Sequence, residues 1–236
     1  MDLPEREAQV QQRSIAAVRA DPEGFIARYR EEFGNRISTD DAAELFAEYN
    51  ASRDARTANR VAVQKAAQWI ARQVYDRALE QPLTKDGRVV FTSGGTGSGK
   101  TTAVRNAGFD GSEIVYDSTL FHFEGAVRDI ERALVAGRCV TILHVPTEPV
   151  EAYRRVLKRA TEIGRIVSIQ SHVITHRGAG ATFVRLQERY PDDRRVAFVG
   201  EANESSYPGL ERKLLYVLEQ ERAAGRVSDL AYSQAE

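Results

Sequence analysis

A glycine-rich stretch after an apolar run carries the clearest chemistry in this chain. The run Arg88–Ser93 is followed by the pattern Gly-x-x-x-x-Gly-Lys-Thr, which begins at Gly94 and ends at Lys100 and Thr101. The backbone N–H groups of such a loop, called a P-loop, surround an anionic phosphate, and the helix that follows points its positive N-terminus at the same group. The pattern predicts a binding site for a nucleoside triphosphate.

The loop residues have separate expected parts. The Lys100 ammonium would reach the β- and γ-phosphates, and the Thr101 hydroxyl would bind Mg²⁺. The chain has no Asn-Lys-x-Asp motif for reading guanine, so ATP with Mg²⁺ is the expected ligand pair. The predicted nucleotide-binding residues of the loop are Gly94, Gly95, Thr96, Gly97, Ser98, Gly99, Lys100, Thr101 and Thr102.

A carboxylate follows the next predicted strand, which ends at Asp117. Ligands of open α/β sheets lie beyond the carboxyl ends of the strands, so Asp117 is expected beside the P-loop. There it could take a proton from an attacking substrate hydroxyl, or hold Mg²⁺ through water. Helix capping together with Ser118 and Thr119 is the structural alternative. Glu124 is a rival base, although an acidic residue in a first helical turn is its ordinary interpretation.

Basic residues cluster after the third predicted strand of this region. Arg159 and Arg165 are the candidates for clamping the transferred phosphate, and a solvated basic face is the alternative for the cluster. His172 and His176 are spaced like a metal pair but lack a third ligand with suitable spacing, which argues against structural zinc. Asn203, after a late strand, is a candidate for the adenine pocket, with a turn-forming role as its alternative.

Alternating strand and helix patterns from Arg88 onward predict an α/β fold, a P-loop kinase-like parallel sheet flanked by helices. The predicted strands are 88–93, 113–117, 139–145 and 195–200. The predicted helices are 100–107, 123–136, 148–163, 180–190 and 208–224.

The segment before the P-loop predicts a helical extension. Its longest helix, over about 56–79, has a predicted buried stripe that includes Val61 and Trp69. We therefore divide the chain into an N-terminal helical segment, 1–85, and a kinase core, 86–236. Within the core, the segment 163–181 is rich in glycine and lacks a clear period, which predicts either a lid or a long loop.

Composition narrows the class further. The 236 residues are 42% hydrophobic and 28% charged with a net charge of −1, as in an ordinary soluble domain, and indicate no nucleic-acid partner. The chain has no signal-peptide pattern and no apolar run long enough for a membrane helix, so a cytoplasmic location is expected. The one cysteine, Cys139, lies in an apolar strand pattern and is expected to fill core space.

These motifs together resemble the zeta-toxin family of P-loop kinases, over about residues 86–205. The resemblance rests on the loop from Gly94 to Thr102, Asp117, the apolar strand at 140–145, Arg159 and Arg165, and Asn203. It implies that Asp117 is the base and that the two arginines act at the lid. It also implies a bacterial toxin or effector with an antitoxin protein as partner.

The resulting expectation is an ATP-dependent kinase that phosphorylates a hydroxyl of a nucleotide-type small molecule. The resemblance implies UDP-N-acetylglucosamine as the first candidate acceptor and NAD as the second. The alternatives are another P-loop phosphotransferase, acting on a nucleoside, antibiotic or metabolite, and a non-catalytic ATP-binding switch.

Overall fold

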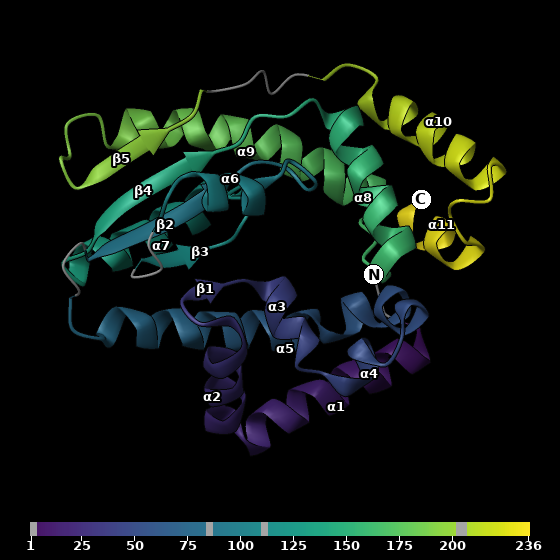
Figure 1. Cartoon of the computed structure of the whole chain (residues 1–236), viewed down its shortest axis with the longest axis horizontal. Coiled ribbons are helices and arrows are strands. Elements are labelled where there is room, and N and C mark those ends of the chain that lie inside the picture. The colour runs from purple at the N-terminus through teal and green to yellow at the C-terminus, as the bar shows by residue number, and fades with distance from the viewer. Residues whose placement is uncertain (1–3, 84–86, 110–112, 202–206) are drawn as a thin grey trace.

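A five-stranded parallel sheet forms the centre of the molecule (Figure 1). The computed structural model describes residues 4–83, 87–109, 113–201 and 207–236. The strand order is β1-β3-β2-β4-β5, and the α/β prediction is confirmed. The strands are β1 (Arg36–Ile37), β2 (Arg88–Ser93), β3 (Ile114–Tyr116), β4 (Cys139–His144) and β5 (Val196–Val199).

Helices cover both faces of this sheet because its strands are apolar on both sides. Val89 and Phe91 of β2 belong to a large core shared with N-terminal helices, whereas Val90 packs in a smaller cluster with Ala103 and Val104. The helices after β2 are α6 (Lys100–Asn106), α7 (Phe123–Val135), α8 (Pro149–Ile163), α9 (Ile169–Arg189), α10 (Leu210–Ala223) and α11 (Asp229–Ala235).

The N-terminal segment lies below the sheet in the view of Figure 1, with its longest helix running along the sheet. Its helices are α1 (Glu5–Ala20), α2 (Pro22–Phe33), α3 (Thr39–Glu44), α4 (Ala47–Asn50) and α5 (Arg53–Glu80). One continuous hydrophobic core joins these helices to β2, β4, α7 and α9. The division near residue 85 stays a prediction.

The N-terminal segment also supplies a strand, which corrects the expectation that it is helical throughout. Arg36 pairs with Val115, and Ile37 pairs with Tyr116, so β1 forms the edge of the sheet beside β3. The Asp117 amide donates to the Ile37 carbonyl at 2.8 Å. A two-residue strand has no periodicity to detect, and its stability comes from burial of Ile37 and from this long-range pairing.

Two further expectations about burial are wrong. Val61 and Trp69 are exposed on α5, because α5 buries a narrower stripe and turns Val61 toward a cavity. Cys139 is exposed as the first residue of β4, where the sheet begins.

The segment 163–181 is mostly helical, which corrects the prediction of an irregular stretch. Only residues 164–168 connect α8 to α9, and Gly178 lies inside α9. A Cβ atom at Gly178 would lie 2.6 Å from the Phe121 carbonyl oxygen, so glycine lets α9 approach the loop after β3. The described residues include no helix long and apolar enough to cross a membrane.

Candidate active site

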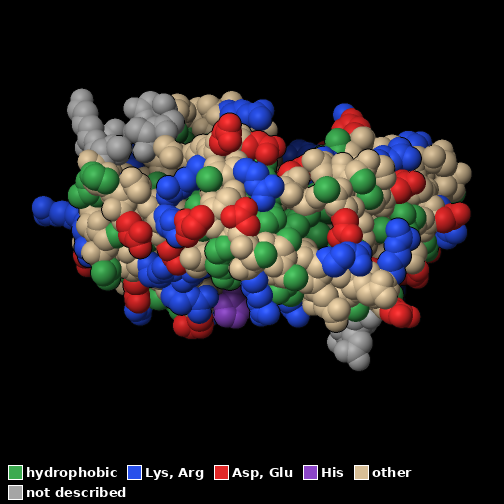
Figure 2. Space-filling view, turned by 90° about the horizontal axis from the view of Figure 1, so that it is seen from below, with side chains coloured by type: hydrophobic (Ala, Val, Ile, Leu, Met, Phe, Trp, Pro, Cys, Tyr) green, Lys and Arg blue, Asp and Glu red, His purple; other side chains and the backbone are tan. Residues whose placement is uncertain are grey.

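A cavity of about 960 Å³ opens between the P-loop and the N-terminal segment. The residues after β3 and the facing sides of α5, α7, α8 and α9 complete its walls. Basic side chains outnumber acidic ones among its described lining residues. On the outer face seen in Figure 2, acidic and basic side chains are instead interspersed. The cavity therefore favours an anionic ligand more strongly than this outer face does.

Glycines give the P-loop its shape. The φ angles of Gly94, Gly97 and Gly99 are +136°, +74° and +93°, values that side chains disfavour. A Cβ atom at Gly97 would lie 2.3 Å from the Ala152 carbonyl oxygen, so the loop lies directly against α8. Helix α6 begins right after Gly99. This strand, turn and helix form the predicted phosphate cradle, and a larger side chain at Gly97 would collide with its support.

Lys100 lies at the edge of this cradle. Its ammonium donates to the carbonyl oxygens of Gly94 and Gly95 at 3.0 and 2.9 Å. Burial lowers the pKa of Lys100, while Asp117 and Asp40 oppose that shift. The ammonium is thus held by its own loop on the cavity side, where a phosphate could exchange with the two carbonyls as its partner.

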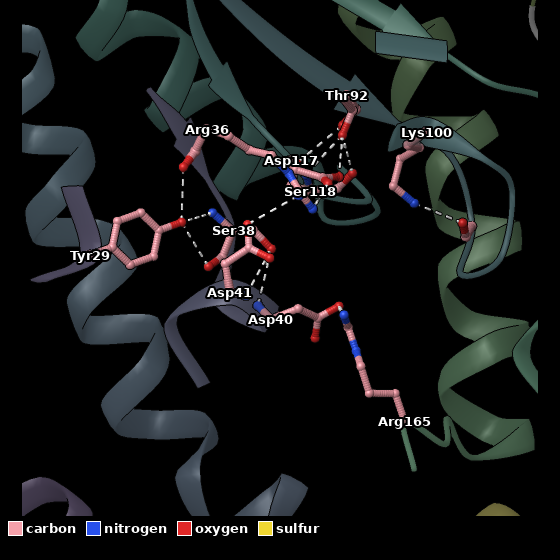
Figure 3. A network of polar contacts seen from close by, with 11 residues as sticks. Tyr29, Arg36, Ser38, Asp40, Asp41, Thr92, Lys100, Asp117, Ser118 and Arg165 are labelled. Carbon is pink, nitrogen blue, oxygen red and sulfur yellow. Dashed lines mark hydrogen bonds and ion pairs between the residues drawn. The ribbon is translucent and has the colours of Figure 1, made fainter. Parts of the chain in front are cut away.

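Asp117 faces the same cavity and is held from two sides. The Thr92 hydroxyl, at the end of β2, donates to Asp117 Oδ1 at 3.1 Å. The Arg36 guanidinium, from β1, donates to Asp117 Oδ2 at 3.0 Å (Figure 3). The Asp117 side chain is 13% exposed. Two donors from neighbouring strands therefore fix the plane of a carboxylate that lies beside the P-loop.

Three arginines meet one carboxylate on the opposite wall. Arg165 forms an ion pair with Asp40, and Arg60 lies 4.0 Å from the other Asp40 oxygen. Burial raises the pKa of Asp40, but Arg165, Arg60 and Arg159 outweigh it and hold that pKa at about 2. Burial and the neighbouring Arg165 lower the pKa of Arg159, whose Nε atom is buried without a hydrogen-bond partner. Asp40 thus offsets part of the repulsion among three cations.

Arg36 links one carboxylate of the N-terminal segment, Asp41, to the carboxylate that follows β3, Asp117. Besides binding Asp117, it lies 3.4 Å from Asp41 Oδ2. Burial raises the pKa of Asp41 to about 6, although Arg36 and Arg165 lower it in part. The Ser38 hydroxyl caps α3 by accepting from the amides of Asp40 and Asp41, which fixes the direction of both side chains (Figure 3). We call Arg36, Asp40, Asp41 and Arg60 the N-terminal wall.

The structure brings most of the predicted site residues together. The residues from Thr96 to Thr102, which include Thr101, line the cavity together with Asp117, Arg159 and Arg165. Glu124 points elsewhere and lies 3.8 Å from Arg185. Asn203 lies outside the described residues.

His172 and His176 lie side by side, but the described residues contain no group of three ligands that could hold a metal.

The N-terminal wall and Thr92 are the site residues that the sequence reading missed. The sequence Ser38-Thr39-Asp40-Asp41 does indicate a helix start, and Ser38 is indeed the cap of α3. Nothing local shows that Asp40 also pairs with Arg165, since that contact depends on how the two distant segments pack. The role of Thr92 could not be predicted for another reason, because Thr92 lies in an apolar run and has the pattern of an ordinary buried strand residue.

Residues 104–208 match the family model for zeta toxin. The match begins just after the P-loop and includes Asp117, Arg159 and Arg165. The comparison with curated proteins found no match. The family suggests a P-loop kinase-like phosphotransferase that binds a nucleotide, in agreement with the loop that precedes the matched residues. The resemblance predicted from the sequence is thereby confirmed over residues 104–208.

Proposed function

We propose that this protein is a kinase that transfers the γ-phosphate of ATP to a hydroxyl of a nucleotide-type small molecule. One observation carries the proposal: Lys100, Asp117 and the pair of Arg159 and Arg165 line the same cavity. A phosphate cradle, a carboxylate beside it and facing guanidinium groups are the parts that phosphoryl transfer needs.

The donor site is the P-loop and the start of α6. The left-handed glycines turn the loop back on itself, and a triphosphate would replace the Gly94 and Gly95 carbonyls as the partner of Lys100. Thr101 lines the cavity at the first turn of α6, where its hydroxyl suits a magnesium ligand. Mg²⁺ held there would neutralise charge on the phosphates. Asn203 stays a prediction for the adenine pocket.

The transfer step assigns Asp117 and the arginines different parts. The acceptor oxygen bonds to the γ-phosphorus while the bond from that phosphorus to the β-bridging oxygen breaks, which releases ADP. The proton of the acceptor hydroxyl passes to the Asp117 carboxylate. Arg159 and Arg165 stabilise the negative charge on the phosphoryl group during its transfer. The hydrogen bond from Thr92 and the ion pair with Arg36 hold the carboxylate ready for that proton.

The acceptor would occupy the part of the cavity beyond Asp117. Val61, Gln64 and Gln68 of α5 line that wall and present an apolar surface and two amides. The excess of basic lining residues suits a phosphate-bearing acceptor. UDP-N-acetylglucosamine is our first candidate and NAD the second, both from the family resemblance, which also suggests an antitoxin partner.

Mass spectrometry tests the proposal directly. Purified protein would be incubated with Mg²⁺-ATP and a panel of UDP-sugars, NAD and nucleosides. We expect one acceptor to gain the mass of one phosphate with the wild type, and no acceptor to gain it with Lys100→Ala. Tight ATP binding without any modified acceptor would favour a nucleotide-binding switch instead.

The Asp117→Asn variant tests the base separately. We expect it to bind ATP like the wild type but to transfer phosphate at least about 100-fold more slowly. Unchanged transfer in this variant, with loss of transfer in Lys100→Ala, would show that another group is the base.

A further inference from the structure

The two histidines of α9 face the P-loop, and the proposed transfer step does not use them. His172 is fully buried and His176 nearly so. Their ring centroids lie 4.3 Å apart, and neither ring lines the cavity. A Cβ atom at Gly95 would lie 2.2 Å from the His176 ring. The loop therefore rests on this ring in close contact.

Hydrogen bonds fix which ring nitrogen of each histidine carries the proton. His172 Nε2 lies 2.8 Å from the Pro149 carbonyl oxygen, which can only accept, so Nε2 carries a proton. In the neutral ring His172 Nδ1 is then an acceptor, and the Thr96 hydroxyl donates to it at 2.6 Å. His176 Nε2 donates to the Thr96 carbonyl oxygen at 3.0 Å by the same reasoning.

Thr96 is thereby held at all three of its polar groups. Besides its hydroxyl and carbonyl contacts, its amide donates to the Thr175 hydroxyl at 3.4 Å. That hydroxyl in turn donates to the His172 carbonyl oxygen at 3.0 Å, within α9. Every partner of Thr96 in this set comes from one rigid helix, so the position of α9 determines the position of the middle of the P-loop.

Burial agrees with neutral rings. Burial and the neighbouring ring lower the pKa of His172 to about 3, and burial lowers the pKa of His176. Lys100 shifts both pKa values in the same direction, while Glu148 opposes the shift for His176. Both rings are thus neutral near pH 7, and the hydrogen bonds are compatible with that state.

We propose that His172, Thr175 and His176 are positioning residues that hold the P-loop in its phosphate-binding shape before a nucleotide arrives. They act through Thr96. The glycines between Gly94 and Gly99 would otherwise be free to move, and ordering them only when nucleotide binds would weaken affinity. Preorganised backbone N–H groups avoid that cost.

Hydrogen exchange of the nucleotide-free, full-length protein tests this inference. Thr96→Val keeps the shape of the side chain but removes the donor to His172. We expect the amides of residues 94–99 to exchange about tenfold faster in this variant than in the wild type. Thr96→Ser keeps the hydroxyl and should exchange like the wild type. Equal exchange in wild type and Thr96→Val would overturn the inference.

Thr161→Val is the matched control. Thr161, on α8, donates its hydroxyl to the Arg226 carbonyl at 2.7 Å, away from the P-loop. The Thr161→Val variant also loses a hydrogen bond donated by a threonine hydroxyl. The P-loop amides of this variant should therefore exchange at the wild-type rate. Acceleration of the loop amides in this control, equal to that in Thr96→Val, would show a general loss of stability and refute the positioning role.

A second pair of variants tests the His176 contact. The side-chain amide of His176→Gln still offers an N–H group to the Thr96 carbonyl, whereas His176→Leu does not. We expect slow loop exchange in the first and fast exchange in the second, and equal rates would overturn this part of the inference. The dissociation constant for Mg²⁺-ATP, about tenfold higher in Thr96→Val, links the loop to binding. Failure of the wild type to bind ATP would refute the proposed function but leave the exchange result intact.

Discussion

The P-loop and the N-terminal wall border the same cavity but are built in different ways. The P-loop is one continuous stretch whose shape comes from glycine backbone angles and from its contact with α8 and α9. The N-terminal wall consists of charged side chains from β1, α3 and α5, held by ion pairs to Asp117 and Arg165. One wall is thus a single backbone segment supported by α8 and α9, and the other is a set of charged side chains held by distant partners.

This difference separates two tasks at one site. A loop that is shaped by its backbone can bind phosphate with few side chains, of which Lys100 is the charged one. A wall made of paired charges can instead orient the groups that react, since Arg36 contacts Asp117 and Asp40 contacts Arg165. We therefore expect changes in the P-loop to affect nucleotide binding, and changes in the N-terminal wall to affect turnover.

The largest effect is expected from Lys100→Ala. Loss of the ammonium removes a charge aimed at the developing phosphate charge, and we expect phosphoryl transfer to fall by about 1,000-fold. Titration with Mg²⁺-ATP should also show weaker binding. Transfer within tenfold of the wild type would contradict the role given to the P-loop.

Arg36→Ala is expected to have the next largest effect. Asp117 would keep only the Thr92 hydroxyl as a side-chain partner, and a misplaced base costs about 100-fold in kcat. ATP affinity should stay at the wild-type value, which separates this wall from the P-loop.

Arg13→Ala is the control for Arg36→Ala, since Arg13 pairs with Glu48 on the surface of the same segment. It should leave kcat unchanged. A common loss of ATP affinity in both variants would erase the distinction between the walls.

Lowering the pH should change the free energy of unfolding in opposite directions through the histidines that support the P-loop and through Asp41 of the N-terminal wall. The folded-state pKa values of His172 and His176 lie below the unfolded value near 6.5, so their contribution to stability is lost as pH falls below that value. Asp41, whose pKa is about 6 when folded and 3.8 otherwise, takes up a proton in the folded state and offsets part of that loss.

From pH 7.5 to 5.5, we expect the loss from the two histidines to exceed the gain from Asp41, so that the free energy of unfolding falls. Urea unfolding of the wild type and of His176→Gln measures this fall, and the variant should lose less free energy of unfolding than the wild type. A pH dependence that is the same in wild type and His176→Gln would contradict the assigned neutral ring.

Asp40→Asn is expected to have the smallest effect. Without this carboxylate the guanidinium groups of Arg60, Arg159 and Arg165 repel one another, and Arg165 loses its ion pair. The Asp40 side chain is 40% exposed, so we expect kcat to fall only about fivefold. Steady-state kinetics beside Asp54→Asn, a surface variant, would measure it. A fall as large as that of Arg36→Ala would mean that Asp40 contacts substrate itself.

The sequence was most informative where structure is local. The P-loop, the strand before it and the helix after it follow from apolar runs and glycine spacing, and Asp117 follows from the rule that ligands lie at strand ends. β1 could not be predicted, because two residues carry no period. The contacts of Arg36 and Asp40 could not be predicted either, since they depend on which distant segments pack together.

The histidine pair shows the same limit. The spacing of His172 and His176 indicated a metal pair that lacked a third ligand, in a segment predicted to be a lid or a long loop. Only the packing of α9 on β2 and the P-loop shows that their partner is Thr96. The glycines of α9 misled the reading of 163–181 for a similar reason, since Gly178 permits a close approach to Phe121.

The pairing of β1 with β3 also has a consequence for the order in which the protein becomes active during synthesis. Arg36 and Asp117 are 81 residues apart along the chain, and Arg165, the partner of Asp40, is made later still. Local helices form early, whereas contacts of such separation wait for the intervening chain to close into a loop. A nascent chain that has passed the P-loop but not Arg165 therefore carries the nucleotide-binding motif and the N-terminal wall without the partner of Asp40, and its site is complete only when its first and later segments meet.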